Sequence, residues 1–322
     1  MIRDRTAARV LEQVGIAPVL VDVGASGAPP RIWSSVAPQS IYVGFDPDLR
    51  EMRTLPDGVF KTSYIVNRAV VAGEGGNVLF HLTRSPFCSS VLPPDARALS
   101  DWLFSDLFDV VSVASVPAES LDTVLVRLGL ERIDWLKTDS QGTDLRIFRS
   151  LCDSVRAKVL AVDVEPGLID AYQGEDLFVD AHRELLREGF WLSSMNVRGS
   201  VRMKRSTLSE LAGAGVNLDE RAITGGVRTT PGWCEARYFR SIDALGTGDE
   251  EQRSLTLLWA FALLDGQYGF ALDIAAAYAR TCGRDSLWST LVEAPARFIR
   301  RRRRRTALGR LGRKVLDRFG VG

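Results

Sequence analysis

The pattern of apolar and polar positions predicts short strands and amphipathic helices along the first 245 residues. Residues 5–15 have the spacing of an amphipathic helix, and the next run, Val19–Val23, is apolar except for Asp22. A strand that stays apolar, without alternation, is typical of a sheet covered on both faces. Ile41–Phe45 has the same character and predicts a second strand.

Further along, the pattern predicts alternating strands and helices. The expected strands cover residues 64–71, 77–82, 110–116, 133–139, 158–164, 190–195 and 235–239. The expected helices cover residues 31–36, 96–108, 121–128, 143–151 and 175–188. We expect residues 64–71 and 77–82 to pair as a hairpin. The alternation of strand and helix predicts an α/β fold with a doubly wound, mostly parallel sheet.

Two stretches depart from this alternation. Residues 198–232 are irregular and contain several glycines, which predicts an insertion over the sheet edge that acts as a lid or substrate-selecting segment. From residue 250 onward the pattern is helical, with helices expected near 254–264, 270–280 and 286–292. We therefore expect a sheet domain over residues 1–245 and a helical extension with a basic tail over residues 246–322.

The composition fits a globular protein and argues against several classes. The 322 residues are 46% hydrophobic and 25% charged, and the net charge of +1 argues against a globally basic nucleic-acid-binding protein. Four scattered cysteines without a C-x-x-C pair, and only two histidines, predict neither a zinc cluster nor a disulfide framework. This cysteine usage suits a reducing cytoplasm, and no stretch predicts a membrane span.

The first strand ends in a glycine turn, which is the first candidate binding feature. Gly24 and Gly27 allow a sharp turn and a close approach of the backbone to a ligand. Ligands of open α/β sheets bind beyond the carboxyl ends of the strands, so the turn predicts a site for a nucleoside cofactor. The full G-x-G-x-x-G pattern of dinucleotide-binding proteins is missing, and a plain strand-to-loop turn is the alternative.

Three acidic residues follow predicted strands and are expected at one edge of the sheet. Asp46 lies about 20 residues after the glycine turn, where nucleoside-binding folds place an acid that accepts hydrogen bonds from ribose hydroxyls. The alternative for Asp46 is a turn acid within Asp-Pro-Asp. Asp139 and Glu165 follow two later strands. Their alternatives are a helix cap for Asp139 and a solvated loop acid for Glu165.

Six short segments, in order, give a resemblance to a known family. They are Val21-Asp22-Val23-Gly24-Ala25, Gly44-Phe45-Asp46-Pro47, Asn67-Arg68-Ala69-Val70, the block Ser120–Val124 with Ile133–Asp144, Glu165-Pro166, and Tyr172-Gln173-Gly174. Over residues 17–242 the chain resembles the FkbM-type S-adenosylmethionine-dependent methyltransferases. Ser26 stands where that family often has asparagine, and Asp46 and Asp144 stand where glutamate is common, so the polar or acidic character is kept.

The resemblance implies a Rossmann-like class I methyltransferase sheet with S-adenosyl-L-methionine as the cofactor. It implies a set of cofactor-binding residues: Asp22, Gly24, Ala25 and Ser26 at the methionine and ribose end, Asp46 at the ribose hydroxyls, and Asn67 and Ala69 near the adenine. The expected acceptor is a hydroxyl of a sugar, glycolipid or secondary metabolite. No metal is required, because the cofactor carries the reactive group.

Methyl transfer to a hydroxyl also needs a group that positions the acceptor and helps remove its proton. Asp139 and Glu165 are the catalytic candidates, because both are expected to face the cofactor edge of the sheet. A carboxylate is a weak base toward an alcohol unless a dry site or a second carboxylate raises its pKa, and their closeness would supply that. His81 is a further candidate base, whereas His182 is expected in packing or at the surface.

The chain ends in a strongly basic stretch in which Arg300 to Arg305 are six consecutive arginines. Such a run attracts the phosphates of anionic lipids or nucleic acid. Interleaved apolar residues favour a basic amphipathic helix at a membrane surface. We expect a cytoplasmic protein with peripheral contact to an anionic membrane and no specific nucleic acid, and the alternative is a solvated tail.

Two other functions remain open on the sequence. A nucleotide-dependent oxidoreductase uses a similar sheet, but the missing third glycine disfavours it. A non-catalytic protein can keep the methyltransferase fold for binding alone, although such a protein would not need to retain acids at Asp22, Asp46 and Asp139.

Overall fold

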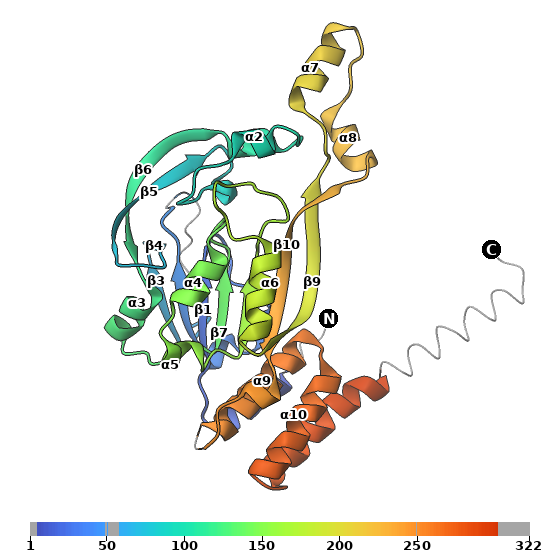
Figure 1. The fold of residues 1–322 in the computed structure, drawn as a ribbon. Helices are drawn as coiled ribbons and strands as arrows, with labels where there is room; N and C mark the ends of the chain where they lie inside the picture. Colours follow the sequence, from blue (N-terminus) through green and yellow to red (C-terminus); the bar gives the residue numbers. More distant parts are fainter. Residues whose placement is uncertain (1–4, 49, 51–57, 249, 302–322) are drawn as a thin grey trace, which may run out of the picture. The chain divides into compact units, whose positions relative to one another are not determined.

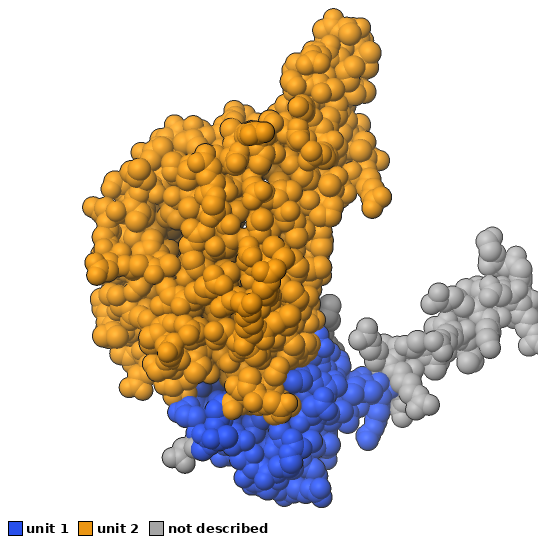
Figure 2. Space-filling view, in the orientation of Figure 1, with its two compact units in different colours: residues 1–16, 246–322 blue, residues 17–245 orange. Residues whose placement is uncertain are grey.

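Residues 5–48, 50, 58–248 and 250–301 are described by a computed structural model, in which the chain forms two compact units. The sheet unit consists of residues 17–245, and the helical unit of residues 1–16 and 246–322 (Figures 1 and 2). The two domains expected from the sequence, 1–245 and 246–322, stay a prediction. The compact units differ from them in the first 16 residues, which group with the C-terminal helices.

The sheet unit contains a seven-stranded, mostly parallel sheet in the order β3-β2-β1-β7-β8-β10-β9 (Figure 1). Its strands are β1 (Val19–Val23), β2 (Ile41–Phe45), β3 (Thr62–Val66), β7 (Trp135–Thr138), β8 (Ala161–Val164), β9 (Phe190–Ser200) and β10 (Thr230–Arg240). The strand β10 runs antiparallel to both of its neighbours, β8 and β9, and the other pairings within this sheet are parallel. The predicted Rossmann-like α/β fold with C-terminal helices is confirmed. The strand order reverses between β1 and β7, which is where such sheets bind ligands.

Four helices pack on one face of this sheet and close the main core. They are α3 (Leu121–Leu128), α4 (Asp144–Ser150), α5 (Asp153–Arg156) and α6 (Phe178–Arg187). As predicted, Ser120 caps α3 by accepting a hydrogen bond from the Thr123 N–H, and Gly129 ends it in the left-handed conformation. The alternate positions of β1, Val19, Val21 and Val23, face this core.

The opposite face of the sheet begins with a layer of aromatic side chains. Between β1 and β2 the chain forms only two short 3-10 helices, η1 (Arg31–Ser35) and η2 (Ala37–Gln39). Trp33 of η1 packs edge-on against Tyr42 and Trp135, with ring centroids 6.3 and 5.9 Å apart. Beyond this aromatic layer the same face carries charged side chains, which the candidate site uses.

A second, three-stranded sheet corrects two predictions. It has the order β4-β6-β5, with β4 (Ala69–Val70), β5 (Gly76–Thr83) and β6 (Val110–Glu119). The strand predicted over residues 64–71 splits at Asn67 and Arg68 into β3 and β4, which join different sheets. The predicted hairpin is also wrong, because β5 pairs with β6, far along the chain, and not with the segment before it. The helix predicted over 96–108 is reduced to α2 (Ala96–Leu99) and η4 (Ser105–Phe108), with η3 (Pro86–Cys88) before them.

The predicted insertion at 198–232 forms an arm on two extended strands (Figure 1). The strand β10 pairs with β8 only over Ala236–Phe239, whereas β9 and β10 pair with each other out to Ser200 and Thr230. The arm carries α7 (Arg205–Gly213) and α8 (Glu220–Gly226). No side chain of α7 is buried.

The helical unit contains α1 (Thr6–Gln13), α9 (Glu251–Asp265), α10 (Tyr268–Thr281) and a helix over 286–301. The indole Nε1 of Trp259 donates to the backbone oxygen of Leu291 at 2.9 Å. None of the helices in the described part of the chain has both the length and the apolar character needed to cross a membrane. The arginine run from Arg300 lies, after Arg301, outside the described residues, so its contact with a membrane stays a prediction.

Candidate functional site

The glycine turn brings the end of β1 against the end of β7. The backbone N–H groups of Gly24 and Ala25 both donate to the Phe45 oxygen at 2.9 Å, which ties the turn to β2. Gly24 has a φ of +77°, and a Cβ at this position would overlap the backbone oxygen of Asp139. Only glycine fits both the conformation and the close approach.

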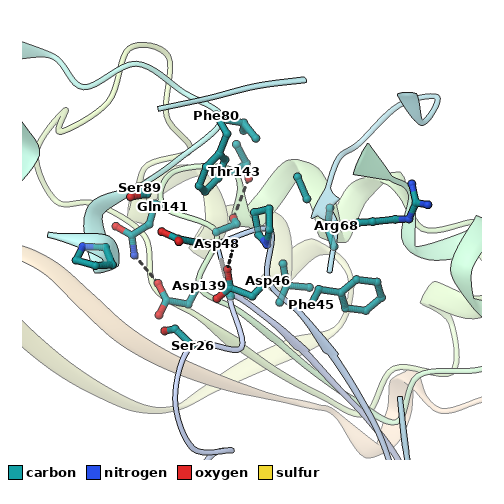
Figure 3. A pocket seen from close by; sticks show the side chains of 18 of the residues that line it. Ser26, Phe45, Asp46, Asp48, Arg68, Phe80, Ser89, Asp139, Gln141 and Thr143 are labelled. Atoms are coloured by element: carbon teal, nitrogen blue, oxygen red, sulfur yellow. Dashed lines mark hydrogen bonds between the residues drawn. The ribbon is translucent and has the colours of Figure 1, made fainter. Parts of the chain in front are cut away.

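A cavity opens beside this turn, and we call it the β2 cavity (Figure 3). Its lining residues are Val23, Gly24, Ser26, Phe45, Asp46, Pro47, Asp48, Arg68, Ala69, Val70, Phe80, Pro86, Phe87, Ser89, Val91, Asp139, Ser140, Gln141 and Thr143. Carboxyl groups of Asp46 and Asp139 lie on one side, and apolar side chains form much of the rest. The cavity volume is about 70 Å³.

Asp46 closes the β2 end of this cavity. Its Oδ1 accepts a hydrogen bond from the Asp48 N–H at 2.8 Å, so the turn role expected of an Asp-Pro-Asp sequence is present as well. Burial raises the pKa of Asp46 to about 6. The Asn67 side chain does not line the cavity, and its Nδ2 donates to the Asp46 backbone oxygen at 2.8 Å. Asn67 therefore acts on the cavity through the backbone of Asp46.

Asp139 is held by a residue that the sequence did not single out. Gln141 has a φ of +56°, which is strained for a residue other than glycine. In this conformation its Nε2 donates to Asp139 Oδ1 at 2.6 Å, and its Oε1 accepts from the Tyr172 hydroxyl at 2.9 Å. Ser90 Oγ also donates to the Gln141 backbone oxygen at 2.7 Å. Gln141, in its left-handed conformation, therefore holds the carboxyl group of Asp139 at the wall of the cavity.

A buried lysine joins the two acids nearest the turn. Lys137 Nζ lies 3.1 Å from Asp22 Oδ1 and 3.8 Å from Asp139 Oδ2, and it donates to the Gly24 oxygen at 3.4 Å. Burial alone would lower the pKa of Lys137, but the carboxylates of Asp22, Asp139 and Glu165 outweigh it and raise the pKa above its ordinary value. The lysine therefore stays protonated. Burial raises the pKa of Asp139, and the charge of Lys137 opposes this rise without cancelling it.

Asp144 ties the ends of β7 and β8 together. One of its oxygens accepts from the Ser140 N–H at 2.9 Å, and the other accepts from the Glu165 N–H at 3.0 Å. The helix α4 begins after Thr143, and Asp139 makes no capping hydrogen bond to it. Burial, followed by the nearby charge of Asp139, raises the pKa of Glu165 to about 9.

A second cavity lies on the opposite face of the sheet, and we call it the β10 cavity. It has a volume of about 370 Å³ and is lined by Asp22, Ser26, Ala28, Pro30, Lys137, Asp163, Val164, Glu165, Ser194, Asn196, Glu235, Ala236 and Arg237. Ser26 lines both cavities.

The predicted site residues divide between the two cavities. Gly24, Ser26, Asp46, Ala69 and Asp139 line the β2 cavity, whereas Asp22, Ser26 and Glu165 line the β10 cavity; Ala25 and Asn67 line neither. The histidines lie elsewhere. His182 Nδ1 lies 3.0 Å from the Tyr238 hydroxyl and its ring stacks on Phe178, as expected for packing. His81 pairs with Ser90 through the backbone and lines neither cavity.

Buried carboxyl groups should make the protein less stable as pH rises. Burial raises the pKa of Asp46 to about 6, of Glu175 to about 7 and of Glu165 to about 9, whereas carboxyl groups of an unfolded chain titrate near about 4. Above pH 4 the unfolded chain releases protons that the folded protein still holds. We therefore expect the free energy of unfolding, measured by urea denaturation, to fall between about pH 5 and pH 9.

The matched variant for this experiment is Glu175→Gln, because Glu175 lines neither cavity. In this variant the free energy of unfolding should no longer fall with pH near pH 7, and its fall at lower and higher pH should remain. A free energy of unfolding that rises with pH over this range would contradict the prediction.

The comparisons with known proteins agree with this arrangement. The profile of the methyltransferase FkbM domain matches residues 27–192, a range that contains Asp46, Asp139 and Glu165. Gly24 lies three residues before the matched range, and Gly27, the second glycine of the turn, is its first residue. Comparison with curated proteins and with solved structures gave no match. Because the matched residues make up just over half of the 322, the chain belongs to the FkbM methyltransferase family.

Proposed function

We propose that the protein transfers a methyl group from S-adenosylmethionine to a hydroxyl of a sugar, glycolipid or secondary metabolite. The observation that carries this is the β2 cavity, where the glycine turn, Asp46 and Asp139 meet at the reversal of strand order. Open α/β sheets bind nucleoside cofactors at this position. Membership of the FkbM methyltransferase family supports the transfer of a methyl group.

The lining of the β2 cavity fits the nucleoside part of this cofactor. Asp46 offers a carboxylate oxygen for ribose hydroxyls, and Ala69, Phe80 and Phe87 offer apolar surface for a flat base. The volume of about 70 Å³ is below the range of about 300 to 1,000 Å³ that holds whole ligands. Phe87 is 60% exposed on the wall of this cavity, so we expect its side chain to move outward when the base enters.

The residues around Asp139 fit the demands of methyl transfer to a hydroxyl. S-adenosylmethionine supplies an electrophilic methyl group when bound. The acceptor hydroxyl has to lie in line with that methyl group and lose its proton. Asp139 is held by Gln141, and burial raises its pKa, so it can orient the hydroxyl and accept the proton. Glu165 lines the β10 cavity, and we propose that it contacts the acceptor.

Binding and transfer test the proposal separately. We expect S-adenosylhomocysteine to bind the full chain in calorimetry and NAD not to bind. Incubation of the protein with methyl-labelled S-adenosylmethionine and a cell extract should give a labelled product heavier by one methyl group than its precursor.

Each alternative function predicts a different result. Binding of NAD without S-adenosylhomocysteine would favour the oxidoreductase. Binding of S-adenosylhomocysteine without any labelled product would favour a non-catalytic binding protein. Binding of neither compound would contradict the assignment of the β2 cavity to a nucleoside cofactor.

A further inference from the structure

The floor of the β10 cavity is a row of charged side chains in register. Asp22 of β1 lies opposite Lys137 of β7, Lys137 opposite Asp163 of β8, and Asp163 opposite Arg237 of β10. Ser194 of β9 continues the row beside Arg237. Because strand side chains alternate between faces, all of these lie on the face opposite to the helices α3 to α6. Charges of alternating sign thus cross four neighbouring strands.

These charges neutralise one another within the protein. Lys137 Nζ lies 3.1 Å from Asp22, and Arg237 donates two hydrogen bonds to Asp163, at 2.8 and 2.7 Å. The Arg237 guanidinium also lies 5.1 Å from the centre of the Trp135 ring. A ligand above this row therefore does not need to bring a counter-charge, but it does need to form hydrogen bonds to fixed polar groups.

The next row along the strands leaves polar groups for a ligand. Asn196 lies opposite Glu235, and its Nδ2 donates to Glu235 Oε2 at 3.1 Å. The side-chain carboxyl of Glu165 has no hydrogen-bond partner among the described residues. Its pKa of about 9 keeps it protonated at neutral pH, so it can donate as well as accept a hydrogen bond. The rim therefore offers both donors and acceptors.

The cavity has the size of a ligand site and a preference in charge. Its volume of about 370 Å³ falls within the range of about 300 to 1,000 Å³ for small-molecule sites. Carboxyl side chains outnumber cations among the lining residues, and both lining cations, Lys137 and Arg237, are already paired. Glu235 pairs with Arg198 at 2.9 Å, and the raised pKa of Glu165 keeps it uncharged at neutral pH, so these lining residues hold no unpaired charge. An acceptor that carries a phosphate or carboxylate would therefore lose its hydration there without gaining a counter-charge.

From these observations we infer that the β10 cavity is the acceptor site and that it takes an uncharged, hydroxyl-rich molecule. The inference rests on the proposed methyl transfer and adds where the acceptor binds and which acceptors are excluded. Hydroxyl groups donate and accept, as the rim residues Glu165 and Asn196 can, whereas Glu235 accepts only. Ser26 lines both cavities and marks the side on which donor and acceptor meet.

A larger side chain on β9 that fills the β10 cavity tests whether the acceptor binds there. Ser194 lines the β10 cavity, whereas its neighbour Met195 lines neither cavity and is 46% exposed. We expect Ser194→Tyr to lower methyl transfer into a cell extract by about ten-fold or more, because the acceptor loses its position. Met195→Tyr, the matched control, should retain transfer. Both variants should bind S-adenosylhomocysteine like the native chain.

A second pair guards against misfolding. Asn196→Tyr and Val197→Tyr repeat the comparison one row further along β9, with Val197 outside both cavities. Thermal midpoints of all four variants should stay close to that of the native protein. The labelled product from the native protein should pass through an anion exchanger at neutral pH, and it should be destroyed by periodate, which cleaves neighbouring hydroxyls.

Other outcomes separate this inference from the proposed function. A loss of S-adenosylhomocysteine affinity in Ser194→Tyr, with adenosine affinity retained, would assign the cavity to the methionine end of the cofactor. A labelled product that binds the anion exchanger, or equal transfer by Ser194→Tyr and Met195→Tyr, would overturn the inference alone. A native protein that labels nothing would overturn both the proposed function and the inference.

Discussion

Replacing Asp139 by asparagine should lower the rate of methyl transfer by about 10²- to 10⁴-fold, the usual contribution of a positioned acid or base. Asparagine keeps the shape of the side chain and an oxygen that can accept from Gln141 Nε2. It removes the negative charge that lies 3.8 Å from Lys137 and the ability to take a proton. The measurement is the initial rate of label transfer into a cell extract, with cofactor affinity followed by calorimetry.

Cofactor binding should survive in Asp139→Asn, because the glycine turn and Asp46 are untouched. The matched control is Asp153→Asn, which makes the same change at a carboxylate that is 93% exposed and pairs with Arg156. It should transfer at the native rate. Native turnover by Asp139→Asn would remove Asp139 from the mechanism.

Replacing Asp46 by alanine should weaken S-adenosylhomocysteine binding by about 10- to 100-fold, the effect expected when hydrogen bonds to a charged group are lost. The pKa of Asp46 is raised to about 6 by burial, so in the native protein the affinity should also fall as pH drops through about 6 and the carboxylate becomes protonated. Asp46→Ala should remove this pH dependence. Calorimetry between about pH 5 and pH 8 measures both effects.

Asp95→Ala is the control for that experiment. Asp95 also accepts backbone hydrogen bonds, from Arg97 and Ala98 at 2.9 Å, but it lines neither cavity. Its replacement should leave the affinity unchanged. Equal affinities of the native protein and Asp46→Ala would defeat the assignment of Asp46 to the ribose.

The sequence predicted correctly those parts of the fold that depend on residues close together in the chain. The strands β1 and β2 have the predicted bounds, because each is a short apolar run that ends at a glycine or at Asp-Pro. The helix cap at Ser120 and the helix end at Gly129 were also predicted, because each depends on the conformation of a single residue. The acids Asp46 and Asp139, predicted from the ends of their strands, line the β2 cavity.

Long-range pairing was outside the reach of these patterns. The strand β5 prefers β6 over the segment before it, and no local signal marks a partner about thirty residues away. Nothing in the sequence pattern predicts the strained conformation of Gln141 either. One signal was present and unused: the period of two in a strand places Asp22 on the face opposite to Val21 and Val23, and thus away from the β2 cavity.

The arm carried by β9 and β10 has a consequence for local stability. The helix α7 has no buried side chain. It is held by the ion pairs of Arg205 and by Leu208, which packs on a small apolar cluster, whereas β10 beside β8 lies in the main core. Amide hydrogens in the arm should therefore exchange with solvent far sooner than those of Ala236–Phe239. Such a segment can accept insertions and substitutions at little thermodynamic cost, so it is where relatives with different acceptors are free to diverge while the sheet stays the same.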